Sequence, residues 1–319
     1  MSSRTNSRLV TAVLVALVML VASSLLGSPS AAAAVSCSAS TPLANRPLLR
    51  NGDTGSCVRV LQRLLVSRGY SVGPTGADGQ FGHRTELAVR RFQSAFQYLR
   101  IDGRSNQATW KALVTGAGTR YSIEKGPNRT NRVTLSFDGC PLTKRAFTTM
   151  VAAAEQRGIA LVFFPMGSCL QQGRFDVAYA RAHGHYVFNH SIDHPDFTTI
   201  SFAAILKQLG APGVVTTYGR PPFGAINATV RDAYAAKGMR IWMWSKDTID
   251  WRGPKPQAEV VRFVTTRVAA GESVLMHMSG NAFNPTALGR MQGGLSAKGI
   301  TICHNRGLTT SASPVTLAC

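Results

Sequence analysis

Acidic residues are scarce in this chain of 319 residues. It has 15 Asp and Glu against 35 Lys and Arg, which gives a formal net charge of +20 at pH 7. The basic residues are scattered, with no long basic block and no basic stripe interleaved with aromatic residues. This pattern argues against a nucleic acid partner and favours retention at an anionic surface.

Long apolar runs are also scarce, because only the stretch from Leu9 to Leu26 is long enough to be a targeting or membrane segment. It follows two arginines and precedes a run of small residues that ends at Ala34. This layout predicts a secretory signal peptide over residues 1–34 and no stable membrane insertion after its cleavage. A membrane anchor is an alternative, since about 18 apolar residues could just span a bilayer. Lipid attachment at Cys37 is another.

No cysteine is left over, because the chain has six and all lie beyond the apolar run. An even number in an oxidising compartment predicts disulfides rather than metal sites. Several pairings are open. Proximity in the sequence favours the pairs Cys37–Cys57, Cys140–Cys169 and Cys303–Cys319.

Apolar residues recur at helical spacing three times between residues 37 and 116. The helices are expected near residues 58–65, with Gly69 as a stop signal, and at residues 85–97 and 107–114. This pattern predicts a small three-helix all-α domain. Residues 117–132 carry Gly, Pro, Asn and Thr without periodicity and are predicted to be a linker.

The loops before the second and third predicted helices repeat each other. One reads Asp78-Gly-x-Phe-Gly82-x-x-Thr and the other reads Asp102-Gly-x-Ser-Asn106-x-x-Thr. Asn is the residue that best replaces glycine in a left-handed backbone conformation. We therefore expect Gly82 and Asn106 to be left-handed.

Short β-rich runs alternate with helical stretches from residue 133 to residue 319. The strand candidates are residues 133–137, 160–164, 239–244 and 273–276, and a helix is expected at 142–157. This alternation predicts an α/β fold with a parallel sheet. Active residues gather at the carboxyl ends of strands in parallel barrels, and Asp138 and His277 each directly follow an apolar run.

Five short motifs in this region carry reactive side chains. They read Ser136-Phe-Asp-Gly-Cys-Pro, His190-Ser-x-x-His-Pro, Arg220-Pro-Pro-Phe-Gly, Asp247-x-x-Asp-Trp and Leu275-Met-His. The two histidines of the second motif, His190 and His194, can present imidazoles to one metal ion. Asp138 is suited to be a base and His277 an acid, so the set is typical of a metal-assisted hydrolase.

In this order the motifs resemble those of the NodB-type polysaccharide deacetylases, zinc-dependent carbohydrate esterases with a distorted (β/α) barrel. The repeated loops and the Phe92-Gln93 and Thr109-Trp110 pairs of residues 37–116 resemble a peptidoglycan-binding domain. The resemblance implies a secreted, cell-wall-associated enzyme that removes N-acetyl groups from peptidoglycan GlcNAc or MurNAc. It implies a divalent metal, zinc or cobalt, and a deacetylase domain over residues 133–319. Chitin is an alternative substrate.

The resemblance also implies a role for each motif. His190 and His194 would hold the metal, and Arg220 would pair with the base Asp138.

Asp247 would orient His277. Trp251 and Leu275 would form the walls of the acetyl pocket, and the backbone amide of Phe223 would join the oxyanion site.

One departure from the family pattern concerns the metal. Relatives usually read Thr-Phe-Asp-Asp-Gly-Pro, so Gly139 stands at the position of the metal-binding aspartate. Two protein ligands are left where catalytic zinc ordinarily has three and a water. Binding by two histidines and waters, a substitute ligand such as Cys140 or Asp193, and loss of metal and catalysis all stay open. The last case would leave a wall-polysaccharide-binding protein.

Overall fold

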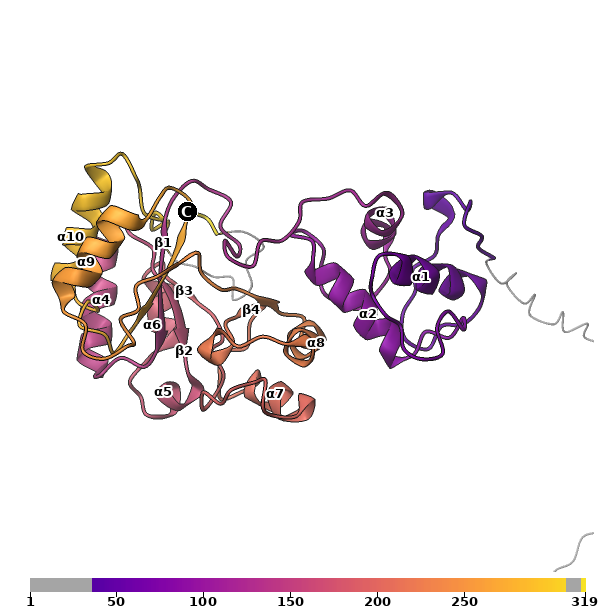
Figure 1. Ribbon diagram of the computed structural model, residues 1–319, viewed down its shortest axis with the longest axis horizontal. Helices are drawn as coiled ribbons and strands as arrows, with labels where there is room; N and C mark the ends of the chain where they lie inside the picture. The colour runs from indigo at the N-terminus through magenta and orange to yellow at the C-terminus, as the bar shows by residue number, and fades with distance from the viewer. Residues whose placement is uncertain (1–35, 308–316) are drawn as a thin grey trace, which may run out of the picture. The chain divides into compact units, whose positions relative to one another are not determined.

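The computed structural model describes residues 36–307 and 317–319 (Figure 1). The signal peptide predicted for residues 1–34 lies outside this part of the chain. Within it, no helix combines the length and the apolar character that crossing a bilayer requires.

Residues 37 to 116 form a helical region, as predicted. Its elements are η1 (Leu43–Asn45), α1 (Ser56–Ser67), α2 (His83–Ser94) and α3 (Gln107–Thr115). The apolar faces of the helices meet in one core that includes Leu61, Phe92 and Trp110. Gly69 has a φ of +86° directly after α1 and donates to the carbonyl of Val66, so it ends this helix as the sequence predicted.

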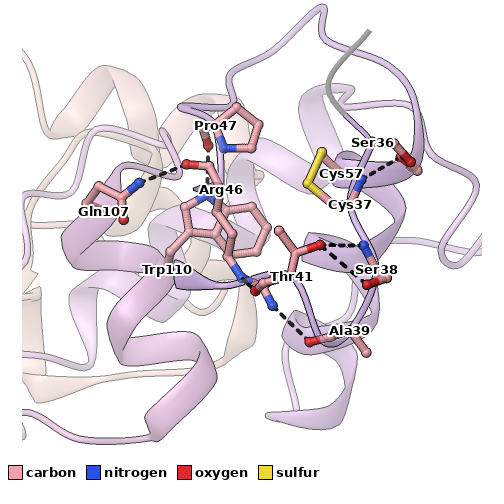
Figure 2. The surroundings of a disulfide bond; sticks show 11 residues. Ser36, Cys37, Ser38, Ala39, Thr41, Arg46, Pro47, Cys57, Gln107 and Trp110 are labelled. Carbon is pink, nitrogen blue, oxygen red and sulfur yellow. Dashed lines mark hydrogen bonds between the residues drawn. A yellow bond between two sulfur atoms is a disulfide. The ribbon is translucent and has the colours of Figure 1, made fainter. Parts of the chain in front are cut away.

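Trp110 belongs to this core and has no exposed surface. Its Nε1–H donates to the carbonyl of Pro47 at 2.7 Å, and the guanidinium of Arg46 lies 4.9 Å from the ring centre (Figure 2). The disulfide between Cys37 and Cys57 joins the leading segment to α1. The indole therefore stabilises the domain and is not accessible to a ligand.

The repeated loops are each held by one buried glutamine. The side chain of Gln62 donates to Asp78 Oδ1 at 2.8 Å and accepts from the backbone N–H of Gly79 at 2.8 Å. Gln93 contacts the second loop in the same way, donating to Asp102 Oδ1 at 3.0 Å and accepting from Gly103 N–H at 3.0 Å. The sequence repeat therefore reflects a repeated hydrogen-bond arrangement.

The left-handed conformation predicted for Gly82 and Asn106 is wrong. Both residues precede a helix as N-caps with negative φ, −91° and −78°. Asn106 is favoured there because its side chain accepts the N–H of Thr109 at 3.0 Å. The left-handed positions of the two loops are Gly79 and Gly103, with φ of +83° and +74°.

The region from residue 133 onward is an α/β fold with parallel strands. One sheet has the strand order β3-β2-β1-β7-β6, and β4 pairs with β5 in a second sheet. The elements are β1 (Thr134–Gly139), α4 (Lys144–Gln156), β2 (Val162–Pro165), α5 (Gly167–Gln171), α6 (Val177–Ala182), β3 (Tyr186–Val187), α7 (Phe202–Gln208), β4 (Tyr218–Gly219), η2 (Pro222–Gly224), α8 (Ala228–Ala236), β5 (Arg240–Ile241), β6 (Lys246–Asp247), α9 (Gln257–Arg267), β7 (Ser273–His277) and α10 (Pro285–Ser296).

The pairings of the described strands do not close into a ring. They end at β6 on one side, and on the other a single bridge, Asn189 to Gly219, connects the large sheet to β4. A parallel α/β fold is thus confirmed, and the distorted barrel stays a prediction.

Strand β1 carries the site because its side chains alternate between two environments. Leu135 and Phe137 face a core shared with α4, α9 and α10, which lie together on one side of the strands (Figure 1). Ser136 and Asp138 therefore point to the opposite side, where Arg220 contacts both.

The three disulfides follow the predicted pairing. Cys140 is bonded to Cys169 in α5, and Cys303 is bonded to Cys319. With the Cys37–Cys57 bond, no cysteine of the chain is free.

Candidate active site

One cavity of about 440 Å³ lies at the carboxyl ends of β1 and β7. Every predicted site residue except Arg220 lines it, namely Asp138, His190, His194, Phe223, Asp247, Trp251, Leu275 and His277. Asp138 and His277 occupy paired positions of adjacent parallel strands, which places them side by side at the same edge of the sheet. Arg220 is fully buried and contacts Asp138.

Asp138 is almost completely buried and is fixed by Arg220. The carboxylate is 3% exposed, and its Oδ1 accepts from Nη1 of Arg220 at 2.6 Å. Nη1 also donates to Ser136 Oγ at 3.1 Å, while Nε and Nη2 donate to the carbonyls of Trp242 and Met243 at 3.0 and 2.7 Å. The guanidinium therefore has one orientation, and it leaves Oδ2 of the carboxylate without a bond to Arg220.

His190 faces this second oxygen. Its Nδ1 lies 2.8 Å from the carbonyl of Arg220, which can only accept, so Nδ1 carries the proton and Nε2 carries the lone pair. Nε2 is 3.7 Å from Asp138 Oδ2, and the ring centre of His194 is 4.9 Å from that of His190.

Burial keeps both imidazoles neutral. It lowers the pKa of His190 to about 4, against the opposing effect of the Asp138 charge. Burial also lowers the pKa of His194 below its usual value. Neutral imidazole is the form that binds a metal, so this pair fits two ligand positions of a metal site.

A third ligand is not provided by the candidates that the sequence suggests. Cys140 is in the disulfide with Cys169, and Asp193 accepts from Nε2 of Gln208 at 3.1 Å. In the part of the chain that the structure describes, no three His, Cys, Asp or Glu side chains form a group that could hold a metal. The donor set therefore fits a catalytic cation only in part.

His277 is oriented by Asp250. Its Nδ1 lies 2.8 Å from Asp250 Oδ1, and its backbone N–H donates to Asp250 Oδ2 at 2.9 Å. Burial disfavours the charged imidazole, but the hydrogen bond to Asp250 and the charges of Asp138, Asp250 and Asp247 outweigh it, so the pKa of His277 is raised. With Nδ1–H bound to Asp250, Nε2 is the ring atom available for proton transfer.

The prediction that Asp247 orients His277 is therefore wrong. Asp247 instead accepts the backbone N–H of Ile249 at 2.7 Å and the indole N–H of Trp251 at 3.3 Å. It holds the turn and the Trp251 ring. The motif offers two carboxylates, and the sequence carries no signal that selects Asp250 over Asp247.

The remaining predicted side chains differ in exposure. Leu275 is 3% exposed, whereas Trp251 is 57% and Phe223 is 69% exposed. The Phe223 ring centre lies 4.6 Å from that of His194. Trp244 also lines the cavity and was not predicted. The roles of these residues toward an acetyl group stay predictions.

Backbone strain is concentrated at this cavity. Among the described residues other than glycine, φ is positive at Ser191, His194, Phe223 and Ile249, between 56° and 67°. Each lies in or directly beside one of the motifs, and each such conformation costs on the order of 1–3 kcal/mol. A buried carboxylate, a histidine with a raised pKa and two neutral imidazoles thus gather around one strained cavity at the ends of parallel strands, a set of groups that can support acid–base hydrolysis.

Comparison with known proteins gives the same class. Residues 125–242 match the family model described as polysaccharide deacetylase, and residues 54–113 match the model described as putative peptidoglycan binding domain. The deacetylase match ends before Asp247, so the two motifs that carry Asp250 and His277 lie beyond it.

Named relatives point in the same direction. The chain is 30% identical over 152 residues to the chitooligosaccharide deacetylase of Rhizobium leguminosarum bv. trifolii, covering 45% of this chain and 69% of that protein. It is also 30% identical over 154 residues to the peptidoglycan-N-acetylglucosamine deacetylase PgdA of Listeria monocytogenes, covering 46% of this chain and 32% of that protein.

The solved structure of the Bc1960 peptidoglycan N-acetylglucosamine deacetylase has the same fold. It is similar with a TM-score of 0.50 and 22% identity, covering 59% of this chain and 93% of that chain. The chain belongs to the polysaccharide deacetylase family. It spans only about a third of the length of the Listeria relative.

Proposed function

We propose that this chain is a secreted, cell-wall-associated deacetylase that hydrolyses N-acetyl groups of peptidoglycan GlcNAc or MurNAc. The observation that carries the proposal is the pairing of Asp138 with His277 across one cavity, each held by its own charged or hydrogen-bonded partner. Hydrolysis of an amide needs a base for the water and an acid for the amine, and this pair supplies both.

In this mechanism Asp138 takes a proton from the attacking water while the water oxygen bonds to the acetyl carbon. Arg220 keeps the carboxylate in place and balances its charge in the buried site. When the carbon–nitrogen bond breaks, Nε2 of His277 gives its proton to the departing amine, and acetate is released. Trp251 and Leu275 confine the acetyl group, and the Phe223 amide stabilises the developing oxyanion.

In this proposal His190 and His194 would hold a divalent cation, zinc or cobalt, which would supply polarisation of the acetyl carbonyl and of the water. In this proposal residues 37–116 bind peptidoglycan, residues 117–132 form the linker, and residues 133–319 form a distorted barrel. The helical domain would deliver the hydrolase to the wall.

Gly139 supports a second candidate function, a wall-polysaccharide-binding protein with little or no turnover. The missing carboxylate leaves an incomplete donor set, while the cavity itself is retained. Such a protein would bind the glycan strand without releasing acetate.

Acetate release from purified peptidoglycan separates the two functions. The mature chain is assayed without added metal and with zinc or cobalt, beside His190→Ala, and its metal content is measured in parallel. If the chain is a deacetylase, added metal should stimulate acetate release. His190→Ala should then abolish both acetate release and metal retention. Wall binding without acetate release under every condition would support the binding function, and release unchanged by His190→Ala would show that the assigned site is wrong.

A further inference from the structure

A second cavity, of about 480 Å³, is lined by residues of α2, α8 and β5 and by residues of the segment 120–123. Four arginines line it, Arg91, Arg120, Arg231 and Arg240, and we call it the arginine cavity. None of its lining residues belongs to the five motifs. Its volume is within the range of small-molecule sites, about 300–1,000 Å³.

Two of the arginines hold the walls of the cavity together. Nη2 of Arg240 donates to the carbonyls of Phe96 and Leu99, both at 2.6 Å, just beyond the carboxyl end of α2. Arg91 in α2 pairs with Asp232 in α8 at 3.2 Å. A cation near the carboxyl end of a helix is favoured by the helix dipole. Arg240 therefore joins β5 to the end of α2, and the Arg91–Asp232 pair joins α2 to α8.

The segment 120–123 forms the third wall and is bonded on both sides. The backbone N–H of Tyr121 donates to the carbonyl of Ala95 at 3.0 Å, and its hydroxyl donates to the carbonyl of Ile241 at 2.8 Å. The carbonyl of Ile123 accepts from the N–H of Met243 at 2.8 Å. The cavity therefore has walls joined by hydrogen bonds and an ion pair.

The other two arginines provide charge that is not neutralised. Arg120 and Arg231 are exposed, and neither forms an ion pair with any carboxylate in the described ranges, 36–307 and 317–319. The guanidinium of Arg120 lies 4.2 Å from the ring centre of Phe96, which orients its plane. Asp232 is already paired with Arg91. The cavity lining therefore carries two guanidinium charges that are free to pair with an anion.

Apart from Ser94, the rest of the lining is apolar or aromatic. Ile123, Met239 and Ile241 contribute aliphatic surface, and Tyr70 and Tyr121 contribute rings. A sugar ring has an apolar face that packs on such surfaces, whereas a bare inorganic anion would leave them unused. The lining thus favours an anion attached to a saccharide.

We propose that the arginine cavity binds an anionic saccharide, with its ring against Tyr121 and the aliphatic floor and its carboxylate or phosphate held by Arg120 and Arg231. The inference deepens the wall binding of the proposed function, on which it rests, and requires neither a metal nor turnover. The carboxylate could come from a muramyl unit of the glycan and the phosphate from a phosphate-containing wall polymer.

Calorimetric titration of the full mature chain tests the proposal. His190→Ala is present throughout, so that binding does not depend on the candidate active site. The probes are the GlcNAc–MurNAc disaccharide, glycerol 3-phosphate and neutral di-N-acetylchitobiose. The test variant is Arg120→Glu with Arg231→Glu, and the matched control is Arg145→Glu with Arg290→Glu, which makes the same charge change at exposed helix positions.

We expect the test variant to weaken binding of an anionic probe at least tenfold and the control variant to change it less than twofold. A loss confined to the disaccharide identifies the carboxylate as the ligand group, and a loss confined to glycerol phosphate identifies the phosphate. Equal losses in test and control variants, an equal loss for the neutral sugar, or no loss at all would overturn the proposal. Because acetate release is measured separately, failure of this site and failure of the proposed function are distinguishable.

Discussion

The two sides of the candidate active site are held by different means. On one side, Asp138, His190 and Arg220 are almost completely buried, and Arg220 bonds to Asp138 through its guanidinium and to His190 through its carbonyl; we call them the buried wall. On the other side, His277 and Trp251 retain exposed surface and are each held by one aspartate; we call them the open wall. Removing the partner of a buried charge costs more free energy than removing the partner of an exposed side chain. Substitutions in the buried wall should therefore have larger effects than substitutions in the open wall.

Arg220→Met should have the largest effect because it leaves the buried Asp138 carboxylate without its partner. Breaking a buried ion pair costs about 3–5 kcal/mol, and the Trp242 and Met243 carbonyls would also lose a donor. Denaturant unfolding should show a loss of that size, and acetate release should disappear.

The double variant Arg220→Met with Asp138→Asn is the control. Removing both charges should recover part of the lost unfolding free energy without restoring acetate release. If the free energy of unfolding of the single variant Arg220→Met lay within about 1 kcal/mol of the wild-type value, the buried wall would not depend on this ion pair.

Asp250→Asn should have the next largest effect. It removes the aspartate that holds His277 of the open wall. Asp250 raises the pKa of His277, so its loss lowers that pKa and deprotonates the acid at a lower pH. The alkaline limb of the pH profile of acetate release should shift to lower pH, and the rate above neutral pH should fall about 100-fold.

Asp247→Asn is the matched control for this test. Asp247 forms hydrogen bonds with Ile249 and Trp251 and raises the pKa of His277 only through its charge, so its removal should leave most of the alkaline limb in place. If the alkaline limb shifted further in the Asp247 variant than in the Asp250 variant, Asp247 would be the residue that orients His277, as the sequence alone predicted.

The correction at Asp250 shows what the sequence could and could not provide. The positions of Asp138 and His277 follow from apolar runs that end at them, because a strand places the next residue at the edge of the sheet. The choice between Asp247 and Asp250 depends on the path of the turn after β6, where Ile249 is left-handed. A linear motif does not encode that path.

The helical domain teaches the same lesson. Helix periodicity and the glycine stop at Gly69 were sufficient to predict α1, and proximity in sequence was sufficient for the disulfides. The role of Asn106 was misjudged because Asn is common both in left-handed turns and at N-caps. Only the bond to Thr109 N–H distinguishes the two.

Gly139→Asp adds a carboxylate next to Asp138 of the buried wall, and its expected effect is smaller. A Cβ at this position would meet no atom within 4 Å apart from those of its chain neighbours, but the φ of +85° strains any residue other than glycine. We expect a stability loss of about 1–2 kcal/mol and a gain in zinc affinity of about tenfold, equivalent to about 1.4 kcal/mol. Gly139→Ala should show the same stability loss without the gain, and equal zinc affinities in the two variants would rule out the missing carboxylate as the defect.

Trp251→Ala should have the smallest effect, because the indole is 57% exposed and belongs to the open wall. Aromatic contacts of this kind are worth about 0.5–1.5 kcal/mol, so KM should rise about two- to tenfold with kcat and unfolding little changed. Trp251→Phe keeps a ring but loses the hydrogen bond to Asp247, so its KM should lie between those of the wild type and the alanine variant. If kcat of Trp251→Ala fell as steeply as that of Asp250→Asn, Trp251 would contribute to holding His277. The residues of the open wall would then depend on one another.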